Sequence, residues 1–197
     1  MKTWIAEIKI SLLATAALAV LVCGLYPLSV HLLGRGLFHG RADGSLVTRE
    51  GTAVGSSLIG RAFEGPGYFH PRPSAAGAGY DGTASGGSNL GPLSRALSEA
   101  VARRAAAYRE ENGLPAAVLL PADAVTASAS GLDPHISPAN ARLQAARVAR
   151  ARGREVSFIL ARIAAYTEGR DLGVLGEPRV NVLLLNLDLD GEGHVRR

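Results

Sequence analysis

The sequence predicts an α+β protein in which a single N-terminal transmembrane helix precedes one mixed α/β soluble domain. Three observations support this fold class. An uncharged apolar run covers Ile10–Val30, apolar residues recur at helical spacing in several later segments, and short segments rich in valine, threonine or leucine lie between them. Beyond the apolar run, the 197-residue chain has room for one compact domain with its own core.

The segment Ile10–Val30 has the length and composition of a membrane anchor. As a helix it would extend about 31 Å, which matches the hydrocarbon core of a bilayer. Its polar side chains are those of Ser11, Thr15, Tyr26 and Ser29. The alternative is a secretory signal cleaved after Ala17-Leu18-Ala19. Such cleavage would leave Val20–Leu33 as an apolar start to a soluble chain, so we favour an uncleaved anchor.

Basic residues flank this anchor on both sides, with Lys2 and Lys9 before it and Arg35, Arg41 and Arg49 after it. The charge rule for membrane helices therefore does not decide the orientation. We expect an N-terminal segment over 1–9, the helix over 10–30, a juxtamembrane linker over 31–44, the soluble domain over 45–190 and a polar tail over 191–197.

The composition argues against nucleic acid as a partner. The net charge of +4 is modest, aromatic residues are few, and the chain has no zinc-finger or RNA-binding signature. A membrane surface or a protein partner fits better. The single cysteine, Cys23, lies within the anchor, so the soluble domain has neither a disulfide nor a thiolate metal site.

In the first half of the domain, residues 45–59 predict one or two short strands with a turn at Glu50-Gly51. Residues 63–92 are too rich in glycine and proline for a regular element, yet they contain Tyr68, Phe69 and Tyr80. Aromatic anchors of this kind favour an ordered loop, and a plain surface loop is the alternative. The pattern then predicts a helix from Pro92 to Gly113, a strand over 115–120 and a second loop over 121–138.

In the second half, Ser137 and Pro138 predict the start of a helix that runs to Arg152 and ends at Gly153. Its apolar residues are mostly alanine, and much of the remainder is covered by Arg142, Arg147, Arg150 and Arg152. A further helix is expected over 155–166. Residues 179–189 have apolar side chains on both faces, which predicts a central strand covered on both sides.

Two glycine-rich stretches have the appearance of phosphate-binding loops. Residues 77–82 match G-x-G-x-x-G, but prolines precede them and more glycines follow, where the motif needs a strand and a helix. Gly86, Gly87, Ser88 and Asn89 lie just before the predicted helix and are weak candidates for a nucleotide or anion site. No lysine follows them as in a P-loop, and we favour a capping turn using Ser88 or Asn89.

Residues 128–137 contain the residue types of a hydrolase triad, with Ser128 or Ser130 beside Asp133 and His135. The G-x-S-x-G elbow is missing, and Asp133 and His135 are only two positions apart. A loop aspartate that caps a turn and a histidine bonded to the backbone explain them without catalysis.

We predict no metal site. Histidines stand at 31, 39, 70, 135 and 194 without ligand spacing, and Asp188, Asp190 and Glu192 lack the rest of a calcium loop.

Together the loop motifs resemble one family, the C subunit of the bacterial potassium-transporting Kdp P-type ATPase. The resemblance runs in order from the anchor to Asp190. It rests on GGSNLGP at 86–92, SGLDPHIS at 130–137 and LGEPRVNV at 175–182, and on these shorter matches: 57–60, Phe63, 68–69, 72–74, 80–81, 125–128, Gln144, 147–149, Arg152 and 167–168. The chain departs from the family pattern, only in turn detail, at Pro92-Leu93-Ser94-Arg95, where the family commonly has an asparagine-proline pair, and at Ala129, where glycine is usual.

The resemblance implies an accessory subunit of a high-affinity potassium uptake complex in the cell inner membrane. Its partners would be a channel-like potassium-binding subunit, a P-type ATP-hydrolysing subunit and a very small membrane peptide. The complex uses ATP, magnesium and potassium, whereas this chain is expected to have no catalytic residue and no bound cofactor. Candidates for contact with partners are Tyr68, Phe69, Arg72, Asp133 and His135.

The resemblance also implies a cytoplasmic N-terminus and an extracytoplasmic domain. A role as catalytic chaperone that raises the ATP affinity of the catalytic subunit is assigned to the family. ATP is cytoplasmic, so with this topology such an effect would have to travel through the complex as a population shift. The alternative functions are a membrane-anchored extracytoplasmic hydrolase that uses Ser128 or Ser130 with His135, and a stand-alone binding module.

Overall fold

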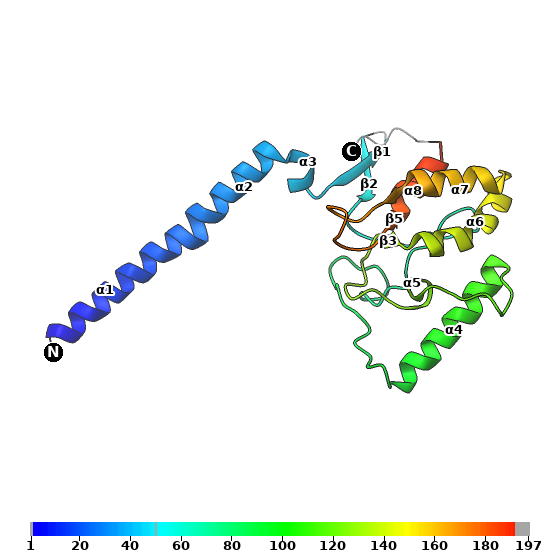
Figure 1. The fold of residues 1–197 in the computed structure, drawn as a ribbon. Coiled ribbons are helices and arrows are strands. Elements are labelled where there is room, and N and C mark those ends of the chain that lie inside the picture. The colour runs from blue at the N-terminus through cyan, green and yellow to red at the C-terminus, as the bar shows by residue number, and fades with distance from the viewer. Residues whose placement is uncertain (1, 50, 192–197) are drawn as a thin grey trace. The chain divides into compact units, whose positions relative to one another are not determined.

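A computed structural model describes residues 2–49 and 51–191 of the chain. The predicted tail lies outside the described residues except for Gly191, and so do Glu50, Glu192 and His194. The chain divides into two compact units, with the boundary between Leu46 and Val47. The structure is mixed, with an N-terminal helical unit and an α/β unit (Figure 1).

The first unit is one long apolar helix with a short helical extension. The helix α1 (Lys2–Ala19), the π-helical stretch η1 (Val20–Leu25) and α2 (Tyr26–Leu37) follow one another without a break, and α3 covers His39–Ala42. Pro27 has no N–H to donate to the preceding turn, which fits the wider winding just before it. The residues expected as a linker are therefore largely helical.

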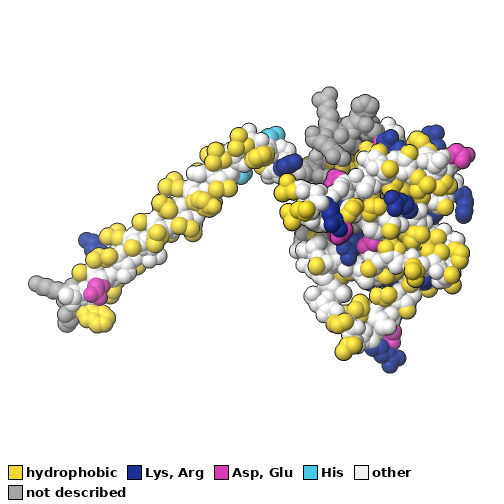
Figure 2. Space-filling view, in the orientation of Figure 1, with side chains coloured by type: hydrophobic (Ala, Val, Ile, Leu, Met, Phe, Trp, Pro, Cys, Tyr) yellow, Lys and Arg dark blue, Asp and Glu magenta, His cyan; other side chains and the backbone are white. Residues whose placement is uncertain are grey.

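Residues Thr3–Leu37 are long and apolar enough to cross a membrane, with a mean hydropathy of 2.2 over the most apolar stretch. Figure 2 shows hydrophobic side chains along the helix, with charged ones near its two ends. Since the described side chains of this helix are exposed to solvent almost throughout, it is not the core helix of a soluble domain. The free cysteine, Cys23, is among these exposed residues.

Two small sheets follow the long helix, and the second of them is antiparallel throughout. In the first, β1 (Leu46–Arg49) pairs with β2 (Thr52–Ser56). In the second, β5 (Arg179–Asn181) lies between β3 (His135–Ile136) and β4 (Thr167–Glu168). His135 is opposite Asn181 and Thr167 opposite Val180. The start of the terminal segment is thus the central strand, as predicted.

The helices of the second unit are α4 (Arg95–Asn112), α5 (Ala122–Val125), α6 (Pro138–Arg152), α7 (Val156–Ala165) and α8 (Val182–Leu189). The main core joins the buried faces of α6 and α7 to Phe69 and to residues of β5 and α8. A second cluster packs Val47 of β1 against Leu183, Leu184 and Leu187 of α8. Helix α8 is therefore covered on all sides.

Several helix boundaries agree with the prediction. Ser137 caps α6 by accepting a hydrogen bond from the Asn140 N–H, with Pro138 in the first turn. Gly113 and Gly153 end α4 and α6 at φ of 64° and 61°, a left-handed conformation that glycine adopts without steric cost.

The predicted start of α4 at Pro92 was wrong. The helix begins three residues later, because the Ser94 hydroxyl accepts a hydrogen bond from the Leu97 N–H and caps it. The preceding residues form a turn closed by the Ser94 N–H on the Gly91 carbonyl. Neither Ser88 nor Asn89 caps the helix.

The predicted strand over 179–189 was correct only as far as Asn181. Its side chain accepts a hydrogen bond from the Leu184 N–H and starts helix α8 instead. An apolar run covered on both sides has no clear period, so a buried helix and a buried strand give the same pattern. The strand predicted over 115–120 was also wrong: these residues form a turn with the Val118 N–H on the Pro115 carbonyl, and Leu119 is exposed.

Candidate functional site

Residues 127–136 are the meeting point of the loops that the sequence singled out. The carbonyl of Ser130 accepts from the Gly86 N–H at 2.8 Å and from the Ser85 hydroxyl at 3.0 Å. The neighbouring carbonyls accept from the Ser74 hydroxyl (at Gly131, 2.6 Å) and from the Gly60 N–H (at Leu132, 2.7 Å). Segments far apart in the sequence are thus fixed to one loop.

Arg72, Asp133 and His135 lie together in this region. The Arg72 guanidinium donates to the Asp133 carboxylate at 3.1 Å, and the same carboxylate accepts from the His135 N–H at 3.0 Å and faces the His135 ring at 3.4 Å. Burial alone would raise the pKa of Asp133, but the hydrogen bonds from His135 and Arg72 outweigh it and lower that pKa. All three groups are therefore engaged in internal contacts.

The serines do not complete a triad with this pair. Ser128 is buried, and the Ser130 hydroxyl accepts from the Leu132 N–H at 3.1 Å. In the part of the chain that the structure describes, no hydrogen bond joins either serine to His135. A nucleophile needs its base within hydrogen-bond reach, so this arrangement does not support hydrolase chemistry.

The glycine-rich turn is also built into the fold. The Gly86 N–H is bonded to Ser130, and a Cβ on Gly87 would lie 2.9 Å from the carbonyl oxygen of Ala129. Gly87 therefore permits a close approach of two loops. Ser88 and Asn89 are exposed, with Asn89 at a φ of 51°. Residues 77–80 and Gly82 form turns.

Of the aromatic candidates, Phe69 is fully buried in the main core, and its side chain is not available to a partner. Tyr68 is half-buried, and its hydroxyl lies 3.4 Å from Asp190. Arg152 covers the Tyr68 ring at 4.9 Å and donates to Asp190 at 2.8 Å. Tyr68 and Phe69 therefore anchor the loop of residues 63–92, which favours the ordered loop over the plain surface loop.

Sequence reasoning missed the polar side chains that hold this loop. Gln144 donates to the His70 carbonyl at 3.0 Å and accepts from the His70 N–H at 2.8 Å. Asn186 makes the same two bonds to Phe69, at 2.9 and 2.8 Å. Arg147 donates to the carbonyls of Pro66 and Tyr68.

The side chain of Arg147 is only 6% exposed. Burial lowers its pKa, and the nearby Glu111 opposes that shift. Asn140, Gln144 and Arg147 are four and three positions apart, so they share one face of the helix. This polar stripe is the sequence signal that could have predicted the burial of Arg147.

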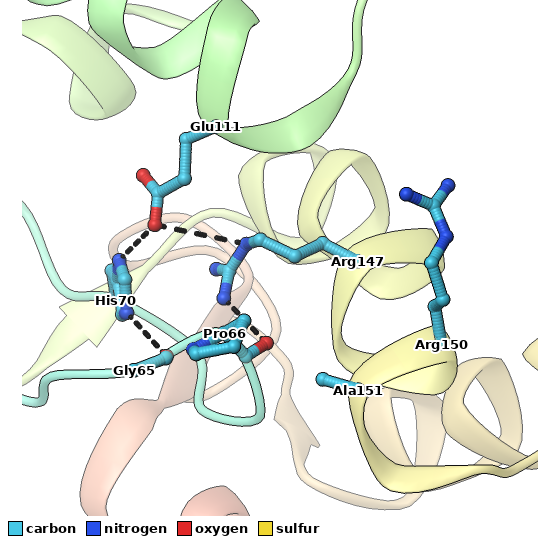
Figure 3. A pocket seen from close by; sticks show the side chains of 7 residues that line it. All are labelled: Gly65, Pro66, His70, Glu111, Arg147, Arg150 and Ala151. Carbon is cyan, nitrogen blue, oxygen red and sulfur yellow. Dashed lines mark hydrogen bonds and ion pairs between the residues drawn. The ribbon is translucent and has the colours of Figure 1, made fainter.

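A surface cavity of about 520 Å³ lies beside this loop (Figure 3). In it, the His70 ring reaches Glu111 at 2.7 Å and the Gly65 carbonyl at 3.0 Å, and Glu111 lies 3.8 Å from Arg147. Arg150 stands apart from these groups in Figure 3. Among the described residues, no three His, Cys, Asp or Glu side chains are grouped to hold a metal ion.

Comparison with known proteins gives a consistent result. The sequence model of the family described as "K+-transporting ATPase, c chain" matches residues 8–191. A potassium-transporting ATPase KdpC subunit of Cereibacter sphaeroides is 50% identical over 95% of this chain and 98% of its own length. The corresponding subunits of Nitratidesulfovibrio vulgaris and Myxococcus xanthus are 54% identical over 93% of each chain and 57% identical over 90% and 85%, respectively.

The order of the loop motifs, the apolar N-terminal helix and these matches agree, and the chain belongs to the KdpC family, the c chains of potassium-transporting ATPases.

Proposed function

We propose that this chain is a non-catalytic subunit needed for assembly of the potassium uptake complex. Its globular domain lies on the extracytoplasmic side of the inner membrane, packs over the potassium entrance of the channel-like subunit and holds the assembly together. The P-type subunit hydrolyses ATP with magnesium, and a very small membrane peptide completes the complex.

The observation that favours a structural role is that the reactive side chains are engaged in contacts within the domain. Arg72, Asp133 and His135 contact one another, and the Gly86 N–H and the Ser130 hydroxyl are engaged in loop contacts. Groups held in this way give a rigid surface more readily than a reaction centre. The long apolar helix anchors that surface to the bilayer.

A catalytic-chaperone effect on ATP affinity is compatible with this proposal only as coupling through the complex. A domain outside the membrane has no access to cytoplasmic ATP. Any change in ATP affinity must therefore arise from a preference of this subunit for one state of its partners.

The proposal is tested by a chain that ends after Arg41 and so retains the apolar helix alone. We expect the complex to assemble poorly and potassium uptake at low external potassium to fall, because the globular domain is missing. The control is Arg142→Ala in the full chain, which should still assemble, because Arg142 is exposed and is not among the candidates for partner contact. Full assembly and unaltered uptake with the truncated chain would contradict the proposal.

A further inference from the structure

The connection between β4 and β5 displays three aliphatic side chains to solvent. Leu172 is 90% exposed, Val174 72% and Leu175 58%. We refer to residues 170–177 as the β4–β5 tip. Exposed leucines on their own are ordinary, but three aliphatic side chains within four positions of one loop form a small apolar surface that the described residues leave uncovered.

The tip is held in one conformation by its own backbone and by ion pairs. Asp171 and Leu175 form a two-way bridge, with both N–H···O distances at 2.9 Å. Arg170 donates to both oxygens of Glu177 at 2.8 and 2.9 Å. Because the loop is already ordered, a partner that binds it need not restrict its backbone further.

Leu172 adopts a conformation that favours glycine. Its φ is 54°, and Gly173 follows with a φ of 77°. A leucine in the left-handed region is less stable than a glycine there by roughly 1 kcal/mol. Such an outlier at a fully exposed position does not stabilise the fold, so its side chain points to a role in an interaction.

The charges around the tip favour a protein partner over lipid. Arg170 is paired with Glu177, while Arg179 is paired with Asp171 and with Glu168. Within residues 168–179, all of which the structure describes, two arginines thus face three carboxylates, which leaves no free cation to attract anionic headgroups. The tip also lacks the tryptophan or tyrosine typical of membrane interfaces.

We propose that the β4–β5 tip docks into an apolar recess on the extracytoplasmic surface of the channel-like subunit. This inference rests on the proposed function and names the surface that makes the contact. Leu172, Val174 and Leu175 fill the recess, and the paired charges at its rim remain hydrated around them.

The test uses the full chain, tagged and co-expressed with the other subunits of the complex. The variant Leu172→Gly removes the side chain while suiting the left-handed backbone, and Val174→Asp adds a charge to the tip. The matched control is Leu119→Asp, because Leu119 is 91% exposed and lies outside the tip. Two quantities are measured: the yield of channel-like subunit recovered with the tagged chain, and the midpoint of thermal unfolding of the tagged chain.

We expect both tip variants to lower the recovered channel-like subunit about tenfold or more. Leu172→Gly should do so with an unfolding midpoint equal to or above that of the wild type, and Leu119→Asp should change neither quantity. Equal recovery with the wild type and both tip variants would overturn the docking site but leave the proposed function intact. Failure of the wild-type chain to recover any channel-like subunit would overturn both.

A separate measurement distinguishes lipid and self-association from the proposed partner. The Gly173 and Val174 amides donate to the Arg170 and Asp171 carbonyls within the tip, so they are protected with or without a partner. The informative amide is that of Leu172, which should exchange rapidly in the full chain alone in lipid nanodiscs. Protection of the Leu172 amide without partner subunits would assign the tip to the bilayer or to a second copy, and would overturn the proposal.

Discussion

Gln144 binds the main chain of His70 through both ends of its side-chain amide, as a neighbouring strand would. The amide oxygen accepts from the His70 N–H and the amide nitrogen donates to the His70 carbonyl. Asn186 binds Phe69 in the same way. Two consecutive residues of an irregular loop therefore have their backbone groups satisfied by side chains from α6 and α8, which lets Phe69 be buried.

Gln144→Leu should reduce the free energy of unfolding by about 3 kcal/mol, because it leaves the part-buried N–H and carbonyl of His70 without partners. Denaturant unfolding of the full chain in detergent measures this change. The exposed Arg142 on the same helix provides the control, since Arg142→Ala should stay within about 0.5 kcal/mol of the wild type. Equal effects of the two variants would contradict this account of the loop.

The sequence predicted most element types but not the network that orders the long loop. Capping serines, terminal glycines and helical spacing are local signals, and they located α6, α7 and the ends of two helices. The partners of Gln144 and Asn186 lie 74 and 117 positions away. No local pattern encodes such contacts, although the polar stripe on α6 indicates that something polar is buried there.

The strand prediction was wrong at residues 182–189 for a related reason. A helix buried on every side has no polar face, so its hydrophobic pattern resembles that of a central strand. The deciding residue was Asn181, whose side chain caps the helix. Of the candidates for partner contact, Arg72, Asp133 and His135 contact one another, whereas Phe69 belongs to the core.

Gly131→Ala should be strongly destabilising. The φ of Gly131 is 69°, and an added Cβ would lie 2.6 Å from both the Ala76 nitrogen and the Gly86 oxygen. Gly153 has a similar φ of 61° but open space around it. The left-handed backbone destabilises both alanine variants by about 1 kcal/mol, and Gly131→Ala adds about 1–3 kcal/mol for overpacking. Equal thermal stability of the two variants would contradict the close approach of Gly131 to Ala76 and Gly86.

Stability in acid should depend on Asp133. Its pKa is lowered in the folded chain: burial opposes the charged form, but hydrogen bonds from His135 and Arg72 outweigh burial. A carboxyl with a depressed folded pKa stabilises the fold above its unfolded pKa of about 3.9, and this contribution is lost as the pH falls through the folded pKa. Asp133→Asn should therefore flatten the dependence of the unfolding midpoint on pH below about pH 4.

The partner of that carboxylate supplies the control for the acid experiment. The substitution Asp133→Asn is repeated in an Arg72→Ala background, and its effect on the pH profile should be smaller there. Part of the stabilisation of the carboxylate comes from the guanidinium, which this background lacks. If Asp133→Asn changes the pH profile equally in both backgrounds, Arg72 does not contribute to the lowered pKa of Asp133.

Stability in alkali should depend on Tyr80, whose hydroxyl donates to the Arg72 carbonyl at 2.5 Å. Burial raises the pKa of Tyr80 to about 12. A group with a raised folded pKa stabilises the fold fully below its unfolded pKa, about 10 for tyrosine, and loses that contribution as the pH rises through the folded pKa.

The wild type should therefore lose stability between about pH 10 and pH 12, and Tyr80→Phe should lose less over that range. Burial also raises the pKa of Tyr108 and of Tyr166, so part of the loss should remain in Tyr80→Phe and become smaller when Tyr108→Phe is added. Thermal unfolding at stepped pH, with tyrosinate absorbance recorded in parallel, measures both effects; a Tyr80→Phe profile parallel to that of the wild type would rule out Tyr80 as a source of the alkaline loss.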